Sequence, residues 1–151
     1  MKNTTLCYIE DNNRYLLLHR IKKENDVNCD KWIGIGGKLE EGESPYDCIK
    51  REIKEETSLD VTELSYRGVV TFTSDIYETE LMHLFTASKF VGTLSECDEG
   101  ELCWVEKDKV LDLPIWEGDK VFLDLLDNEC PFFSLKLVYK GDKLQYYLLN
   151  E

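Results

Sequence analysis

Three glutamates that stand close together are the residues of this chain best suited to chemistry: Glu52, Glu55 and Glu56. Carboxylate oxygens clustered without histidine or thiolate are the ligands that Mg²⁺ prefers, with Mn²⁺ as a substitute. For these glutamates taken alone, a solvated acidic face on an acidic chain is the alternative explanation. Gly37 and Glu43 precede them in the same stretch of sequence, and this longer pattern favours a metal site.

The glutamates lie on a helix that we expect to begin at Ser44-Pro45, because serine caps free backbone N–H groups and proline suits the first helical position. At about 100° per residue, they occupy an arc beside an apolar stripe that should face the core. The last turn, which holds Glu55 and Glu56, disfavours anions by about 0.3–1 kcal/mol each. A sequence that departs from local rules in this way often does so at a functional site. The apolar stripe consists of Tyr46, Ile49 and Ile53.

Residues 37–59 resemble the Nudix box, in which a glycine, a glutamate and the run Arg-Glu-aliphatic-any-Glu-Glu follow one another at fixed intervals. The matching residues are Gly37, Glu43, Arg51, Glu52, Ile53, Glu55, Glu56 and Leu59. Ser58 departs from the pattern, since the family has glycine there, and we expect left-handed backbone at a cost of about 1 kcal/mol. The resemblance implies the α+β fold class, with a Nudix α/β/α sandwich whose mixed β-sheet lies between helices.

Most of the remaining chain is predicted to form strands, together with a second amphipathic helix, which agrees with this fold class. Helical segments are expected at residues 107–111 and 119–126, and loops at 22–31 and 91–101. No linker or internal repeat divides the chain, so we expect one domain over residues 1–151. The predicted strands are residues 3–9, 14–21, 64–74, 79–90, 102–105, 132–139 and 144–149.

The composition restricts the partners that this chain can have. A net charge of −13 argues against long nucleic acids, which need a basic surface, but it is compatible with a small polyanion bound together with a metal ion. No run approaches the roughly 18 apolar residues of a membrane span. Polar and charged residues interrupt the N-terminal segment early, so we expect no signal peptide and a cytoplasmic protein. The sequence leaves both a monomer and a homodimer open.

Six scattered cysteines in a chain of this kind are expected to be reduced thiols, several of them buried. They contain no CxxC pair, so a disulfide framework or a zinc site is not expected.

The resemblance assigns the metal ligands by position. It implies that Glu52, Glu55 and Glu56 bind the metal or orient water, and that the Gly37 carbonyl completes the metal shell. A further carboxylate from outside the box is expected from the loop after residue 91. Glu99 is our choice, Glu96 and Glu101 are alternatives, and a merely solvated loop is a further one. Between Glu52 and Glu99, the general base stays open.

Three other residues of the box segment receive supporting roles. The resemblance implies that Glu43 and Arg51 pair and hold the loop against the helix. Lys38, directly after the glycines, is a candidate phosphate contact, and an ordinary exposed lysine is the alternative.

Residues 31–38, 82–85 and 113–119 resemble segments of the mammalian oxidised-purine triphosphatases within the family. This resemblance implies that Trp116 stacks on the base and that Asp119 accepts or shares protons with its edge. Core packing is the alternative for Trp116, and a plain strand residue is the alternative for His83, a candidate pocket residue. Ile33 replaces an asparagine that contacts the base, which could cost about 1–3 kcal/mol of discrimination.

The leading hypothesis is Mg²⁺-dependent hydrolysis of oxidised purine nucleoside triphosphates, such as 8-oxo-dGTP, to the monophosphate and pyrophosphate. One alternative is a Nudix hydrolase of another diphosphate, such as a nucleotide sugar, ADP-ribose or a pterin triphosphate. A second alternative is a binding module of the same fold without catalysis, against which the intact set of glutamates argues.

Overall fold

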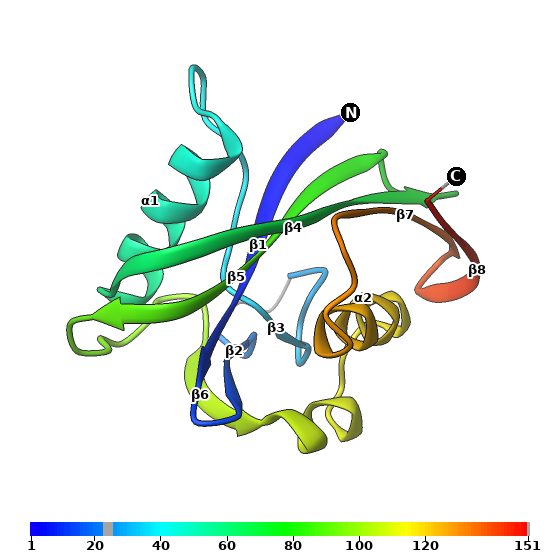
Figure 1. The fold of residues 1–151 in the computed structure, drawn as a ribbon. Coiled ribbons are helices and arrows are strands. Elements are labelled where there is room, and N and C mark those ends of the chain that lie inside the picture. The colour runs from blue at the N-terminus through cyan, green and yellow to red at the C-terminus, as the bar shows by residue number, and fades with distance from the viewer. Residues whose placement is uncertain (23–25, 151) are drawn as a thin grey trace.

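The computed structural model describes residues 1–22 and 26–150, and it combines one mixed β-sheet with two α-helices in the described chain (Figure 1). The helices are α1 (Pro45–Thr57) and α2 (Glu117–Asp127), with a 3₁₀ helix η1 (Lys107–Asp112). The strands are β1 (Lys2–Asp11), β2 (Arg14–His19), β3 (Trp32–Ile33), β4 (Asp60–Ser74), β5 (Glu80–Val91), β6 (Glu101–Glu106), β7 (Phe133–Lys140) and β8 (Lys143–Leu149).

The strands follow the order β3-β2-β1-β5-β4-β7-β8, and β6 pairs with β2. Two neighbouring pairs, β1 with β5 and β4 with β7, are parallel, whereas the other pairs are antiparallel. Strands β1 and β5 lie in the middle of the sheet. Successive side chains of β1 point to opposite faces of the sheet. The mixed sheet expected from the sequence is confirmed.

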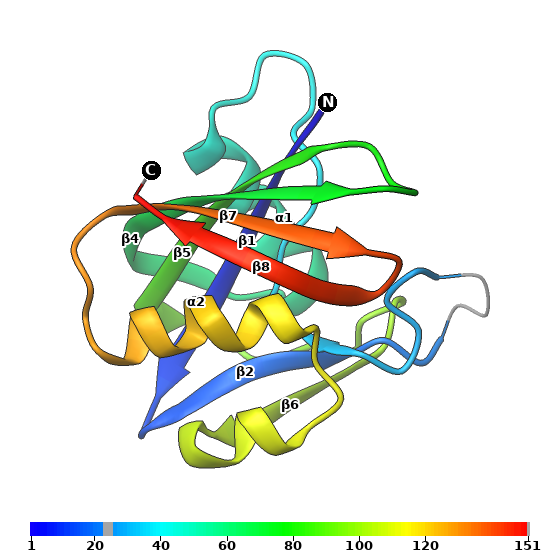
Figure 2. The same ribbon diagram turned by 90° about the vertical axis from the view of Figure 1, so that its right-hand side faces the viewer.

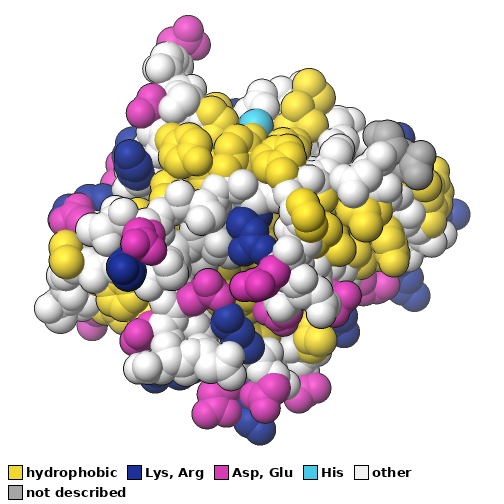
Figure 3. Space-filling model, in the orientation of Figure 1, with side chains coloured by type: hydrophobic (Ala, Val, Ile, Leu, Met, Phe, Trp, Pro, Cys, Tyr) yellow, Lys and Arg dark blue, Asp and Glu magenta, His cyan; other side chains and the backbone are white. Residues whose placement is uncertain are grey.

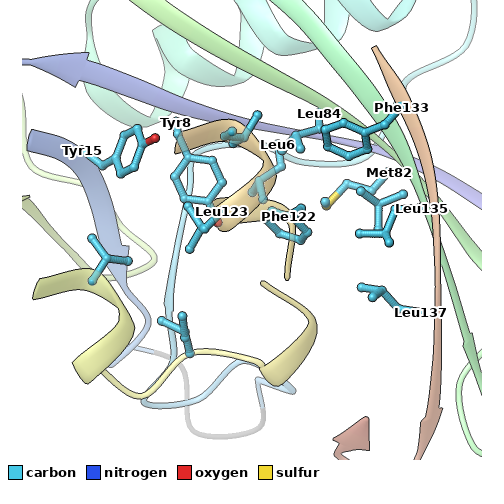
Figure 4. Packing of buried hydrophobic residues seen from close by; sticks show 14 of the residues in the cluster. Leu6, Tyr8, Tyr15, Met82, Leu84, Phe122, Leu123, Phe133, Leu135 and Leu137 are labelled. Atoms are coloured by element: carbon cyan, nitrogen blue, oxygen red, sulfur yellow. The ribbon is translucent and has the colours of Figure 1, made fainter. Parts of the chain in front are cut away.

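The interior contains two hydrophobic cores, one on each face of the sheet, and successive side chains of β1 point alternately into them. Leu6 and Tyr8 pack with α2 residues such as Phe122 on one face, and Figure 4 shows part of this cluster. Cys7 belongs to the opposite core, which contains Ile53 of α1. The two helices accordingly cover opposite faces of the sheet, as the two views of Figures 1 and 2 show. This arrangement confirms the expected α/β/α sandwich.

Helix α1 begins and ends as its sequence predicts. The Ser44 side chain accepts a hydrogen bond from the Asp47 backbone N–H, and Asp47 accepts one from the Ser44 N–H, which together form a capping box. The helix ends at Ser58, whose φ of 67° is left-handed. Tyr46 differs from the prediction, because it lies in the first turn with 41% of its surface exposed and meets Phe85 only edge-on.

Most of the other predicted elements are found with shifted ends. The strand predicted at 14–21 ends at His19, the strand predicted at 64–74 begins at Asp60, and the second helix begins at Glu117. The loop predicted at 22–31 includes residues 23–25, which lie outside the described residues. All six cysteines are free thiols, and Cys7, Cys48 and Cys97 are buried.

Two surface properties bear on the expected partners. Within the described residues, no helix combines the length and the apolar character needed to cross a membrane. On the face that Figure 3 shows, acidic and basic side chains are interspersed among the described residues and form no broad basic area.

Candidate active site

The glycine-rich segment before α1 lies directly on β1. The Ile35 backbone exchanges two hydrogen bonds with Cys7, at 2.6 and 2.9 Å, and the Thr5 N–H donates to the Gly37 carbonyl at 2.8 Å. At Gly36 the two backbones come so close that a Cβ atom would lie 2.7 Å from the Thr5 carbonyl carbon. Glycine at this position therefore lets the segment run antiparallel alongside β1.

Two glutamates of α1 contact this segment. A Cβ atom on Gly37 would lie 2.5 Å from Cδ of Glu52, so the Glu52 carboxylate occupies the space that a side chain would take. Glu56 accepts a hydrogen bond from the Gly36 N–H at 3.2 Å. The expected association of Gly37 with these carboxylates is therefore present in the fold, although the Gly37 carbonyl itself faces the Thr5 N–H.

Arg51 connects the loop to the helix. Its guanidinium binds Glu43 through two hydrogen bonds of 2.7 and 2.9 Å and also donates to Glu52 at 2.8 Å and to Glu55 at 3.2 Å. A fifth contact reaches the Lys38 carbonyl at 3.2 Å. The Arg51 hydrogen bonds to Glu43, together with one from the Glu40 backbone N–H, lower the pKa of Glu43 to about 2. The geometry agrees with the supporting role expected of Glu43 and Arg51, because a two-bond arginine–carboxylate pair fixes orientation as well as charge.

Glu56 is the most buried carboxylate of the cluster, with 8% of its surface exposed. Its pKa is raised to about 9, first by burial, then by the hydrogen bond with Glu99 and the charges of Glu52 and Glu99. Burial also raises the pKa of Glu52, against the lowering effect of Arg51. Arg20 donates to Glu99 at 2.9 Å. The tertiary structure thus brings Glu99, 43 residues further along the chain than Glu56, into the cluster.

The donor set suits a hard divalent cation. The charge of Glu99 raises the pKa of both Glu52 and Glu56, and the charge of Glu52 raises that of Glu56 further; a cation would relieve this repulsion. Among residues 1–22 and 26–150, no three acidic, histidine or cysteine side chains form a preformed cation site. Arg51 instead holds the Glu52 and Glu55 carboxylates, so metal binding requires these side chains to exchange partners. Glu55 is the most exposed of the three helix glutamates.

A cavity of about 380 Å³ opens beside this cluster. Gly36, Gly37 and Lys38 line one part of it, and Ile33, Trp116 and Asp119 line another. The carboxylates do not line it directly, but the two glycines that contact them do. The structure therefore brings the predicted substrate-binding residues on α2 and β3 to the same cavity as the box.

Trp116 lies half-buried at the start of α2, held on several sides. Its indole N–H donates to Asn28 Oδ1 at 2.7 Å, and the Lys31 ammonium lies 5.1 Å from its ring centroid. Its ring meets Tyr139 edge-on, with centroids 5.8 Å apart. Trp116 therefore forms part of the cavity wall, in addition to packing against the core. Asn28 was not among the predicted site residues, because nothing in its local sequence marks it.

Asp119 is buried in the cavity wall with only 5% of its surface exposed. Its pKa is raised to about 8, mainly by burial and further by the charge of Glu80, while Lys31 acts in the opposite direction. At neutral pH the carboxyl is therefore mostly protonated, with one O–H donor and one acceptor oxygen.

His83 is the predicted site residue that the structure does not bring to this cavity. Successive side chains of β5 point to opposite faces, and Met82 and Leu84 belong to the core on the α2 side. His83 instead contacts Tyr66 and the Asn3 side chain, and it does not line the cavity. The assignment of His83 to the pocket is corrected accordingly, and the alternative of a plain strand residue describes its position.

A family model described as the NUDIX domain matches residues 2–126, and the chain belongs to this family. It is thus a Nudix hydrolase, a class that generally uses a divalent metal ion.

The relatives agree with this assignment. An uncharacterized Nudix hydrolase of Bacillus subtilis, YvcI, is 30% identical over 131 residues, or 83% of this chain and 79% of that protein. The oxidized purine nucleoside triphosphate hydrolase of Danio rerio is 35% identical over 131 residues, covering 85% of this chain and 83% of the other. The crystal structure of a MutT protein from Bacillus halodurans is 28% identical, with a TM-score of 0.88, covering 99% of this chain and 98% of that one.

Proposed function

We propose that this Nudix hydrolase cleaves oxidised purine nucleoside triphosphates, such as 8-oxo-dGTP, to the nucleoside monophosphate and pyrophosphate, with Mg²⁺ as its metal ion. The observation that carries the proposal is that Trp116 and Asp119 line the same cavity as Gly36 and Gly37, which contact the carboxylates. An aromatic surface and a protonated carboxyl group thus share one cavity with the metal-binding segment. Similarity to the Danio rerio hydrolase supports the same substrate class.

The carboxylates Glu52, Glu56 and Glu99, with Glu55 and the Gly37 carbonyl, are the groups proposed to hold Mg²⁺. The bound ion would screen the phosphate charges and lower the pKa of water. Arg51 and Glu43 fix the loop that carries Gly37. Lys38, exposed on the cavity rim, adds a positive charge where the phosphates would lie. The residue that removes the proton from water is left open between Glu52 and Glu99.

The base would bind in the part of the cavity that Trp116 and Asp119 line. Trp116 offers a flat aromatic surface for stacking. Protonated Asp119 can donate one hydrogen bond to the purine edge and accept another, a combination that an ionised carboxylate lacks. Ile33 lines the cavity and supplies only apolar contact, at the position where the resemblance implies an asparagine. Hydrolysis of this kind would remove damaged purines from the nucleotide pool before they enter DNA.

A panel of substrates tests this proposal directly. Turnover is measured with 8-oxo-dGTP, dGTP, ADP-ribose, a nucleotide sugar and a pterin triphosphate, each with Mg²⁺, with Mn²⁺ and with EDTA. We expect kcat/KM for 8-oxo-dGTP to exceed that for every other compound by at least about tenfold, the effect of one well-placed hydrogen bond. Equal rates on all five compounds contradict the proposed specificity, and full activity in EDTA contradicts the metal dependence.

A further inference from the structure

The loop before β3 places one polar side chain on the cavity wall beside Trp116. The Asn28 N–H donates to Asp26 Oδ1 at 3.1 Å, and the Asn28 carbonyl accepts from the Lys31 N–H at 2.8 Å. Asp26 is itself bound by Arg20, whose Nε donates to Oδ2 at 2.6 Å. These bonds anchor Asn28 to the end of β2, so its side chain has a defined position on the cavity wall.

The bond to Trp116 determines which way the Asn28 amide is turned. An indole N–H is a donor only, so the Asn28 atom 2.7 Å from Nε1 must be the oxygen. The amide NH₂ group is then the free end. No hydrogen bond to this group occurs within residues 1–22 and 26–150, and Asn28 lines the cavity. The side chain therefore holds Trp116 with its oxygen, and among the described residues none accepts a hydrogen bond from its NH₂ group.

The side chains around Trp116 differ in the donors that they can offer to a bound base. Ile33 carries no polar side-chain atom, and Trp116 has already used its only donor. Protonated Asp119 supplies one O–H donor. A purine with a ring carbonyl needs a donor for that oxygen, because a buried acceptor without a partner weakens binding.

We infer that Asn28 is a specificity-determining residue, whose amide NH₂ donates to a ring carbonyl oxygen of the bound purine while its oxygen positions Trp116. Asn28 thereby supplies from the loop the polar contact that Ile33 cannot make. This role rests on the proposed function only in requiring that the cavity takes a purine nucleotide. It predicts a preference for purines that carry a carbonyl oxygen over those that carry none.

The variant Asn28→Asp separates the two ends of the side chain. Aspartate keeps an oxygen for the Trp116 N–H but replaces the NH₂ donors with a second acceptor. Binding of 8-oxo-dGMP, dGMP and the monophosphate of 2-aminopurine deoxyriboside, which has no carbonyl, is measured by calorimetry. We expect Asn28→Asp to weaken binding of both carbonyl purines at least about tenfold, and binding of the 2-aminopurine nucleotide less than about threefold. The Trp116 indole N–H resonance, assigned with Trp116→Phe, should keep its hydrogen-bonded shift.

A matched control is Asn12→Asp, the same change in the exposed turn between β1 and β2, where φ is 51° and aspartate is tolerated. It should bind all three nucleotides as the wild type does. The role of Asn28 is overturned if Asn28→Asp weakens binding of all three nucleotides equally, or weakens none of them. It is also overturned if the wild type binds no purine nucleotide. A wild type that binds purines but hydrolyses another purine nucleotide faster than 8-oxo-dGTP contradicts only the proposed function.

Discussion

The Glu52 carboxylate lies against Gly37, in the space that a Cβ atom would occupy. The contact joins the glycine segment on β1 to the helix that carries the proposed metal ligands. Because Glu52 is also held by Arg51 at 2.8 Å, its position depends on both the missing side chain and the ion pair.

Gly37→Ala should inactivate the enzyme without unfolding it. The new methyl group would meet the end of a flexible glutamate, which can move aside, but the displaced carboxylate no longer stands where the metal needs it. We expect kcat/KM to fall by about 100-fold, as for a displacement of about 1 Å in a catalytic group, with little change in Tm. Steady-state kinetics and thermal unfolding measure the two effects.

Gly36→Ala is the matched comparison, because its Cβ would meet the Thr5 backbone instead of a movable side chain. We expect it to lower the free energy of unfolding by about 1–3 kcal/mol. A Gly37→Ala protein that is less stable than Gly36→Ala contradicts this comparison, because the Glu52 side chain should move aside more easily than the Thr5 backbone.

Glu56→Gln should abolish metal-dependent hydrolysis and leave the fold intact. Glutamine has nearly the shape of the protonated glutamate, which is the form that a pKa of about 9 favours at neutral pH without metal, so stability should stay near that of the wild type. Activity should fall by about 100-fold or more, as for the loss of a key electrostatic group. Exposed Glu41 provides the control, since Glu41→Gln should retain full turnover. Unchanged turnover in Glu56→Gln refutes its assignment as a metal ligand.

Asp119 should make stability depend on pH. Its pKa is 3.8 as a free group and about 8 in the folded protein, so between these values the folded state holds one more proton than the unfolded state. Its stabilising contribution is therefore complete below pH 3.8 and is lost as the pH rises through about 8, at about 1.4 kcal/mol per pH unit. Asp119→Asn cannot titrate, so its stability should fall less steeply between pH 5 and 8.

Urea unfolding in EDTA at several pH values measures this difference. Glu56 titrates in both proteins, so its effect cancels when the two curves are compared. Parallel curves for Asp119→Asn and wild type would show that Asp119 is ionised in the folded state throughout this range.

Ser58→Gly should stabilise the protein. Ser58 closes α1 with a φ of 67°, which glycine adopts without the cost that a side chain brings. We expect the free energy of unfolding to rise by about 0.5–1 kcal/mol. The variant also loses the exposed hydrogen bond between Ser58 Oγ and Ser95 Oγ, and Ser95→Ala measures that loss alone. A Ser58→Gly protein that is less stable than Ser95→Ala contradicts backbone strain at this position.

Much of the site was predictable because it is local. The start of α1 at Ser44-Pro45 follows from the residue types of its first turn, and the resemblance to the Nudix box implied the pairing of Glu43 with Arg51 and the left-handed backbone at Ser58. Helical periodicity fixes the direction of such residues relative to one another, whatever the remainder of the chain does.

The contacts between distant segments depended on the tertiary structure. Glu99 could be proposed from the sequence only alongside Glu96 and Glu101, and its contact with Glu56 depends on how the loop before β6 folds back. His83 was misplaced because alternation along a strand defines two faces but does not say which one meets the cavity. Asn28 gave no signal at all, since its partner Trp116 lies 88 residues away. The sequence by itself thus determined the Nudix box and the hydrolase class, whereas only the folded sheet decided which side chains surround the proposed base.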